Sequence, residues 1–240
     1  MQHHRNLRIP DSLADASDPE RMALVVYDMQ VGVVSQLSDG PQVTERVGRV
    51  LEAARDAGVR VFFTRHMTLP TELMGVFQLR MAMAWQRKDR VEDVVSPFLR
   101  DSPGFEIVPE LAPRASEAIF DKLSLSAFEG TPLEFALRDV QLTGFAIAGV
   151  ATEVGLELTA RHGADLGLIP IVVTDACGAG NHAAAKRSFE TLAFAGDAIL
   201  TDTSTITGLL AGAATSPKGG DPDTAIREVA GSREASPPKS

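Results

Sequence analysis

The chain has 240 residues, of which 44% are apolar and 23% charged, a composition typical of one large globular domain with a sizeable core. Its formal net charge of −9 argues against nucleic acid or an anionic membrane surface as the main partner. No apolar run is long enough to span a membrane, and residues 1–21 lack the apolar core of a secretory signal. The single cysteine, Cys177, excludes an intrachain disulfide, and together these features predict a cytoplasmic protein.

Six short apolar runs alternate with helical patterns along the chain. The runs, which are rich in β-formers, span residues 23–28, 59–64, 117–122, 144–149, 170–175 and 197–202. Several are continuous apolar stretches, which is typical of parallel strands buried on both faces. Helical patterns fit between most of them, over residues 42–58, 131–140, from about 152, and 182–196. This alternation predicts an α/β fold of three layers, with a doubly wound, Rossmann-like sheet of six parallel strands.

The composition divides the chain into three parts. Residues 1–20 are predicted to form an N-terminal arm, 21–212 a single domain, and 213–240 a flexible tail rich in Gly, Pro, Ser and charge. Inside the domain, the Met- and Arg-rich segment 68–110 interrupts the alternation of strands and helices. We expect it to form one or two helices and a loop that cover the sheet edge or the site.

Polar residues at the ends of the predicted strands are the candidates for chemistry, because ligands bind beyond the carboxyl ends of open parallel sheets. The first strand ends at Asp28, followed by Met29 and Gln30, and the third ends at Lys122. The fourth runs into a helix for which Thr152 is the predicted N-cap. An aspartate beside a lysine can transfer protons, and a helix N-terminus can stabilise an anion. From spacing alone, Asp28 could equally be a cap or turn residue.

Three blocks carry a family resemblance: "ALVVYDMQ", "FDKLSLSAFEGTPLEFAL" and "GVATEVGLELTARHGADLGLIPIVVTDACGAG". In this order they resemble the isochorismatase-like hydrolase superfamily, also called cysteine hydrolases, over roughly residues 20–212. The resemblance implies the isochorismatase-like hydrolase fold, a small-molecule substrate and a homodimer or homotetramer. It places the family's catalytic aspartate, lysine and cysteine at Asp28, Lys122 and Gly155, and a cis peptide bond at Val150–Ala151. We expect no cofactor.

Glycine at position 155 removes the side chain that attacks a carbonyl carbon in the amidases of the family. Its backbone N–H could still serve as an oxyanion donor. The isochorismatase branch is similar in having glycine there; in it an aspartic acid protonates a vinyl ether and water attacks the resulting cation. That branch carries a tyrosine and a histidine where this chain has Ala151 and Glu153. We therefore predict a hydrolase that uses Asp28 and Lys122 without a cysteine nucleophile, on an unassigned small, polar or anionic substrate.

Two alternatives remain open. In one, Glu153 is a second carboxylate that activates water for amide or ureide hydrolysis. Glu153 could instead be only a favourable partner of the dipole of its helix. In the other, the chain is a catalytically inactive binding protein on the same fold. His66 has no second histidine nearby, so no metal site is predicted. The residues expected to contact the substrate follow strand ends or begin the helix at 152: Gln30, His66, Phe128, Ala151, Thr152 and Glu153.

Overall fold

The computed structural model describes residues 1–215 and pairs the six predicted strands in one sheet. The strands are Met22–Tyr27 (β3), Arg60–His66 (β4), Ala118–Lys122 (β5), Gly144–Gly149 (β6), Ile169–Cys177 (β7) and Ile199–Thr201 (β8). Their order is β5-β4-β3-β6-β7-β8, and every neighbouring pair is parallel. The order reverses between β3 and β6, so the doubly wound α/β sheet is confirmed.

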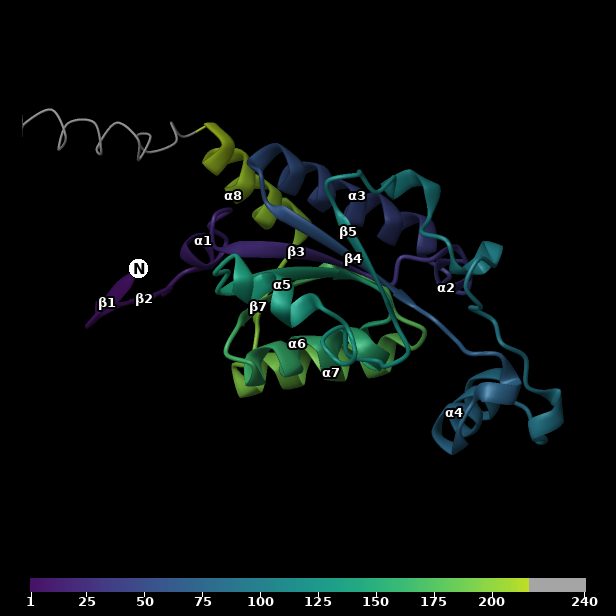
Figure 1. The fold of residues 1–240 in the computed structure, drawn as a ribbon. Coiled ribbons are helices and arrows are strands. Elements are labelled where there is room, and N and C mark those ends of the chain that lie inside the picture. Colours follow the sequence, from purple (N-terminus) through teal and green to yellow (C-terminus); the bar gives the residue numbers. More distant parts are fainter. Residues whose placement is uncertain (216–240) are drawn as a thin grey trace, which may run out of the picture.

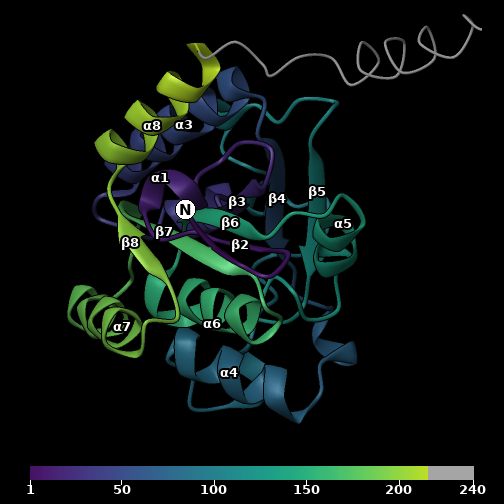
Figure 2. The same ribbon diagram turned by 90° about the vertical axis from the view of Figure 1, so that its left-hand side faces the viewer.

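Helices cover both faces of this sheet and complete the three layers (Figures 1 and 2). On one face lie α3 (Gly40–Ala57) and α8 (Thr203–Thr215), and on the other α5 (Leu133–Asp139), α6 (Glu157–Asp165) and α7 (His182–Ala195). Each face has its own buried apolar cluster. Strands β3 and β6 are buried along their whole length between these clusters, which explains their uninterrupted apolar sequences.

Sequence reasoning missed α8, whose Ser, Thr and Gly content is typical of loops. Two of its residues, Ile206 and Leu210, are buried in the cluster that also contains the inner face of α3. The helix continues to Thr215, so the predicted domain end at residue 212 falls inside it. Residues 216–240 of the predicted tail lie outside the described residues.

The first twenty residues form an arm with its own local structure. A two-stranded antiparallel hairpin, β1 (Gln2–His4) and β2 (Leu7–Ile9), projects from the domain (Figure 1). It is followed by the short helix α1 (Leu13–Ala16), whose N-cap Ser12 accepts a hydrogen bond from the backbone N–H of Asp15. Among residues 1–215, no helix is both long and apolar enough to cross a bilayer.

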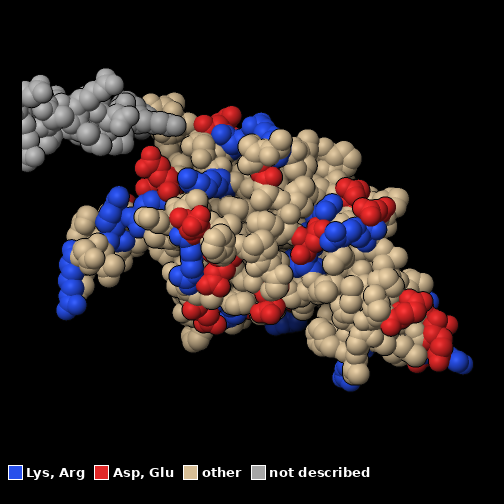
Figure 3. All heavy atoms as spheres, viewed as in Figure 1, with Lys and Arg blue, Asp and Glu red and all other residues tan. Residues whose placement is uncertain are grey.

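The segment after β4 forms one α-helix and several short turns, within the predicted range. It contains η1 (Thr71–Leu73), α4 (Val76–Gln86), η2 (Val91–Asp93), η3 (Pro103–Phe105) and η4 (Pro109–Leu111), while α2 (Val31–Val34) follows β3. Helix α4 has no buried residue, and Val76 is 85% exposed. Uncharged surface dominates the projecting lobe that carries α4, apart from charges at its far end (Figure 3). That this surface supports a homodimer or homotetramer stays a prediction.

Candidate active site

The structure brings Asp28 and Lys122 together at the carboxyl ends of the strands, next to the reversal of strand order. Lys122 Nζ lies 2.7 Å from Asp28 Oδ2. Asp28 comes directly after β3, Lys122 is the last residue of β5, and both are almost fully buried. The proximity expected from the strand ends is therefore observed, in the region where ligands bind in open α/β sheets.

Every polar group of this buried pair has a hydrogen-bond partner. Asp28 Oδ1 accepts a hydrogen bond of 2.7 Å from Thr64 Oγ1. Lys122 Nζ also donates to Tyr27 Oη at 3.0 Å and to the carbonyl oxygen of Ser124 at 3.3 Å, so all three ammonium donors are used. Burial of two charges is tolerated when their hydrogen bonds are completed in this way. The geometry fixes a carboxylate and an ammonium in contact.

Tyr27 is a site residue that sequence reasoning missed. Successive side chains of a regular strand point to opposite faces, so neighbouring residues such as Tyr27 and Asp28 do not usually share a partner. Asp28 has φ +47°, outside the strand conformation, and both side chains reach Lys122. Burial, with the Asp28 carboxylate beside it, raises the pKa of Tyr27 well above its usual value, so the phenol stays protonated. The available signal was that the chain's only tyrosine stands in an aliphatic run before Asp28.

Gly155 lies against Tyr27, and this contact explains why the position has no side chain. A Cβ atom built at Gly155 would lie 1.9 Å from Tyr27 Oη and 2.8 Å from the carbonyl oxygen of Leu125. The same tyrosine hydroxyl donates a hydrogen bond to that carbonyl oxygen. The phenol therefore fills the space that a side chain at 155 would need. The backbone N–H of Gly155 donates to Ala151 O at 3.2 Å, and its role as an oxyanion donor stays a prediction.

The backbone after β6 carries the predicted cis peptide bond at Val150–Ala151. The following turn, Thr152–Leu156 (η5), is π-helical, and its N-cap is Ala151; the prediction that Thr152 is the N-cap is wrong. Thr152 is fully buried, and both its backbone N–H and its hydroxyl donate to Gly178 O. These two hydrogen bonds to the loop after β7 give Thr152 a structural role in place of the expected substrate contact.

Glu153 is directed to the start of α7. Its Oε1 accepts a hydrogen bond of 2.7 Å from the backbone N–H of Asn181, the N-cap of that helix. Its Oε2 is buried and has no partner among the described residues. Glu153 thus contacts the N-terminus of a neighbouring helix, and its two predicted roles, as a partner of its own helix dipole or as a second carboxylate, stay predictions.

Two further residues expected to bind substrate have other positions. The Gln30 side chain is fully buried and makes three hydrogen bonds to backbone groups: it donates to His66 O and Phe105 O and accepts from His66 N. Its amide thus ties the end of β4 to the loop before η4, with both N–H groups occupied. Phe128 is buried in the core, edge-on to Phe145 and His162. Both residues are corrected from substrate contacts to structural positions.

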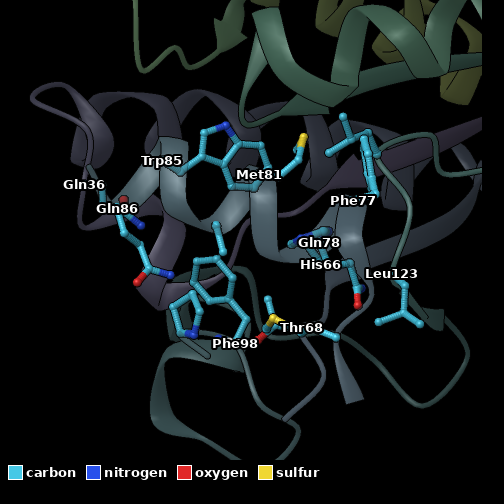
Figure 4. Close-up of a pocket in the computed structure, with 14 residues that line it drawn as sticks. Gln36, His66, Thr68, Phe77, Gln78, Met81, Trp85, Gln86, Phe98 and Leu123 are labelled. Carbon is cyan, nitrogen blue, oxygen red and sulfur yellow. Dashed lines mark hydrogen bonds between the residues drawn. The ribbon is translucent and has the colours of Figure 1, made fainter. Parts of the chain in front are cut away.

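His66 does line a cavity, as expected from its place after β4. The cavity, of about 150 Å³, lies between α4 and the loop that follows Lys122 (Figure 4). Burial lowers the pKa of His66 below its ordinary value of 6.5, and the Lys122 ammonium lowers it further. Its Nδ1 is buried and has no hydrogen-bond partner among the described residues. The imidazole is therefore neutral near pH 7.

The lowered pKa of His66 makes stability depend on pH in a defined direction. The unfolded chain takes up this proton near pH 6.5 and the folded chain only at lower pH, so the unfolded state binds more protons between the two values. We expect the free energy of unfolding to fall below pH 6.5, with this residue contributing at most about 1.4 kcal/mol per pH unit. Denaturant unfolding from pH 7 to 5 measures it. His66→Gln should flatten the slope of unfolding free energy against pH, whereas His182→Gln, at an exposed histidine, should leave this slope unchanged. Equal slopes in wild type and His66→Gln would refute the prediction.

The one cysteine lies away from this pair. Cys177, at the end of β7, donates its thiol hydrogen to Val173 O at 3.1 Å. Burial raises the pKa of this thiol well above its usual range, which keeps it protonated. Among the described residues, no three His, Cys, Asp or Glu side chains gather as they would around a metal ion.

A three-layer α/β fold with a buried carboxylate–ammonium pair beside a cavity, at the carboxyl edge of its sheet, defines a small-molecule enzyme of the α/β class. The family is shown by sequence: the model described as "Isochorismatase domain" matches residues 22–205, and the chain belongs to the isochorismatase family of hydrolases. The ureidoacrylate amidohydrolase RutB of Serratia proteamaculans (strain 568) is 29% identical over 70% of this chain and 73% of its own. Enterobactin synthase component B of Escherichia coli (strain K12) is 28% identical, over 70% of this chain but only 56% of its own length.

Solved structures show the same architecture. A cysteine hydrolase from Pseudomonas syringae pv. phaseolicola 1448A superposes with a TM-score of 0.70 at 25% identity, covering 81% of this chain and 94% of that one. An N-carbamoylsarcosine amidase from Thermoplasma acidophilum gives a TM-score of 0.62 at 19% identity, covering 83% and 99% of the two chains. The second likeness bears on the fold alone.

Proposed function

We propose that the protein is a small-molecule hydrolase in which Asp28 and Lys122 carry out acid–base chemistry without a cysteine nucleophile. The observation that carries this proposal is the contact of Gly155 with Tyr27, which leaves 1.9 Å between a built Cβ and the phenol oxygen. A thiol has no room there, so a covalent acyl-enzyme cannot form at this position. The thiol of Cys177 is protonated and bonded to Val173 O, so it offers no substitute nucleophile.

The reaction then needs water as the nucleophile and one group that moves a proton. For an enol ether, the pair delivers a proton through Asp28 to the carbon–carbon double bond, and water adds to the resulting cation. The water gives a proton back to Asp28, and the hemiketal so formed collapses to a ketone and an alcohol. One water is consumed, and the pair returns to its starting state. General acid–base catalysis of this kind contributes about 10²- to 10⁴-fold in rate.

A second candidate is hydrolysis of a C–N bond, favoured by the name of the ureidoacrylate amidohydrolases among the relatives at 29% identity. In that reaction the water oxygen bonds to the carbonyl carbon while Asp28 takes a proton from the water. Asp28 then returns this proton to the leaving nitrogen. Glu153 was the carboxylate first considered for this step. Its Oε1 accepts from Asn181 N, whereas Asp28 contacts the buried ammonium, which favours Asp28 as the base.

A turnover screen tests both candidates. Purified protein is assayed with enol ethers, amides and ureides, beside Asp28→Asn and the exposed control Asp89→Asn. We expect turnover of one class by wild type and Asp89→Asn, and a loss of about 10²- to 10⁴-fold in Asp28→Asn. Full activity of Asp28→Asn would refute the acid–base role. Absence of wild-type turnover, with ligands that still raise the melting temperature, would identify a binding protein on this fold.

A further inference from the structure

The cavity beside His66 is linked to the Asp28–Lys122 pair through the loop after Lys122. Leu123 and Leu125, which belong to the loop that follows Lys122, line the cavity. The carbonyl oxygen of Leu125 accepts the hydrogen bond from Tyr27, whose Oη accepts in turn from Lys122. His66 pairs with Lys122 in the register of β4 and β5. Neither Asp28 nor Lys122 lines the cavity, which is connected to the proposed catalytic pair through Tyr27 and the loop after Lys122.

The walls of the cavity are apolar and aromatic. Trp85 and Phe98 each lie edge-on to His66, with ring centroids 6.4 Å and 6.2 Å away, and Phe77 and Met81 add further apolar surface (Figure 4). Among its fourteen lining residues there is no Asp, Glu, Lys or Arg.

The polar groups of the lining are few, and several are already used. The amide of Gln86 bonds to the backbone N–H and carbonyl of Val95, and Thr68 Oγ1 accepts from Phe98 N. The guanidinium of Arg65, next to His66 in sequence, pairs with Asp121 at 2.8 Å, and neither Arg80 nor Arg87 lines the cavity. The remaining polar side chains of the lining are Gln36, Gln78 and His66, and the unpaired Nδ1 of His66 is itself buried.

From this lining we propose that the cavity binds the uncharged, apolar or aromatic part of the substrate. This deepens the proposed function, on which its catalytic meaning rests, and it departs from the polar or anionic substrate expected from the sequence. A carboxylate placed here would lose its hydration without a cationic partner, whereas an amide would need only one or two hydrogen bonds. Carboxylate-bearing compounds are therefore disfavoured.

Trp85 allows binding to be measured without turnover, since it is the only tryptophan of the chain and lines the cavity. Benzamide and benzoate serve as matched probes, with the same ring and different charge. We expect benzamide to change Trp85 fluorescence saturably, and benzoate to bind at least about tenfold more weakly. Equal or tighter binding of benzoate, or no saturable signal from either probe, would overturn the proposal.

Variants assign the signal to the cavity and separate it from catalysis. Phe98→Ala should weaken benzamide binding several-fold, whereas Phe135→Ala, an exposed residue of α5, should not. Met81→Arg places a cation in the lining and should shift the preference toward benzoate. If benzamide binds to the wild type but the wild type turns over no compound of the screen, the hydrolase proposal fails while the ligand class stands. Unchanged benzamide affinity in Phe98→Ala together with unchanged selectivity in Met81→Arg would refute the cavity as the site.

Discussion

Replacing Lys122 with methionine is expected to lower the free energy of unfolding by about 3–5 kcal/mol, because the Asp28 carboxylate stays buried and loses its ammonium partner. The two groups are 2.7 Å apart, with side chains 0% and 7% exposed, so solvent cannot replace the lost contact. Tyr27 Oη and Ser124 O lose a donor as well. Turnover should also fall, because the Asp28 carboxylate then lacks the ammonium that stabilises its charge. Denaturant unfolding and steady-state kinetics measure the two effects.

The matched control is Lys88→Met, the same change at an exposed lysine, which should alter stability by less than about 0.5 kcal/mol. The double variant Asp28→Leu/Lys122→Met removes both charges and should regain most of the lost stability while staying inactive, because an apolar pair of similar size can replace a buried ion pair. If the single variant is as stable as wild type, Asp28 is not a buried charge that depends on Lys122. If the double variant retains activity, the pair is not catalytic.

The fold could be predicted because its signals are local. Runs such as "ALVVYD" and "GFAIAG" have the length and apolar character of buried strands, and turn residues flank them. Each strand could therefore be located to within about two residues. The ends of parallel strands converge on one edge, which is why Asp28 and Lys122 could be expected together although they are far apart in sequence. Helix α8 was missed because it is held by packing of Ile206 and Leu210, not by a local pattern.

The side-chain contacts of the site could not be predicted in the same way. The role of Tyr27 depends on one backbone angle at Asp28, and strand periodicity predicts the opposite face. Gln30, Thr152 and Phe128 were chosen for their position near strand ends, but their partners come from segments distant in sequence. Glycine at 155 could be read as a missing nucleophile, yet the tyrosine that fills its space is known only from the folded chain.

Adding one methyl group at Gly155 is expected to destabilise the protein by about 1–3 kcal/mol and to reduce turnover. The added Cβ meets Tyr27 Oη at 1.9 Å, its Cζ at 2.9 Å and Leu125 O at 2.8 Å, so the phenol must move. Because the same phenol accepts a hydrogen bond from Lys122 at 3.0 Å, its displacement also disturbs the Asp28–Lys122 pair. Unfolding of Gly155→Ala in denaturant, with kcat measured in parallel, checks both effects.

Gly208→Ala is the matched control, since the same change in α8 meets no atom within 4 Å and should leave stability unchanged or raise it by up to about 1 kcal/mol. The link to Tyr27 is tested by a double-mutant cycle with Tyr27→Phe, which removes the oxygen that the new methyl group meets. The two changes should together cost less than the sum of their separate costs, with a coupling of about 1 kcal/mol or more. Additivity within about 0.5 kcal/mol would mean that the tyrosine hydroxyl does not exclude a side chain at 155, and the argument against a nucleophile there would lose its physical basis.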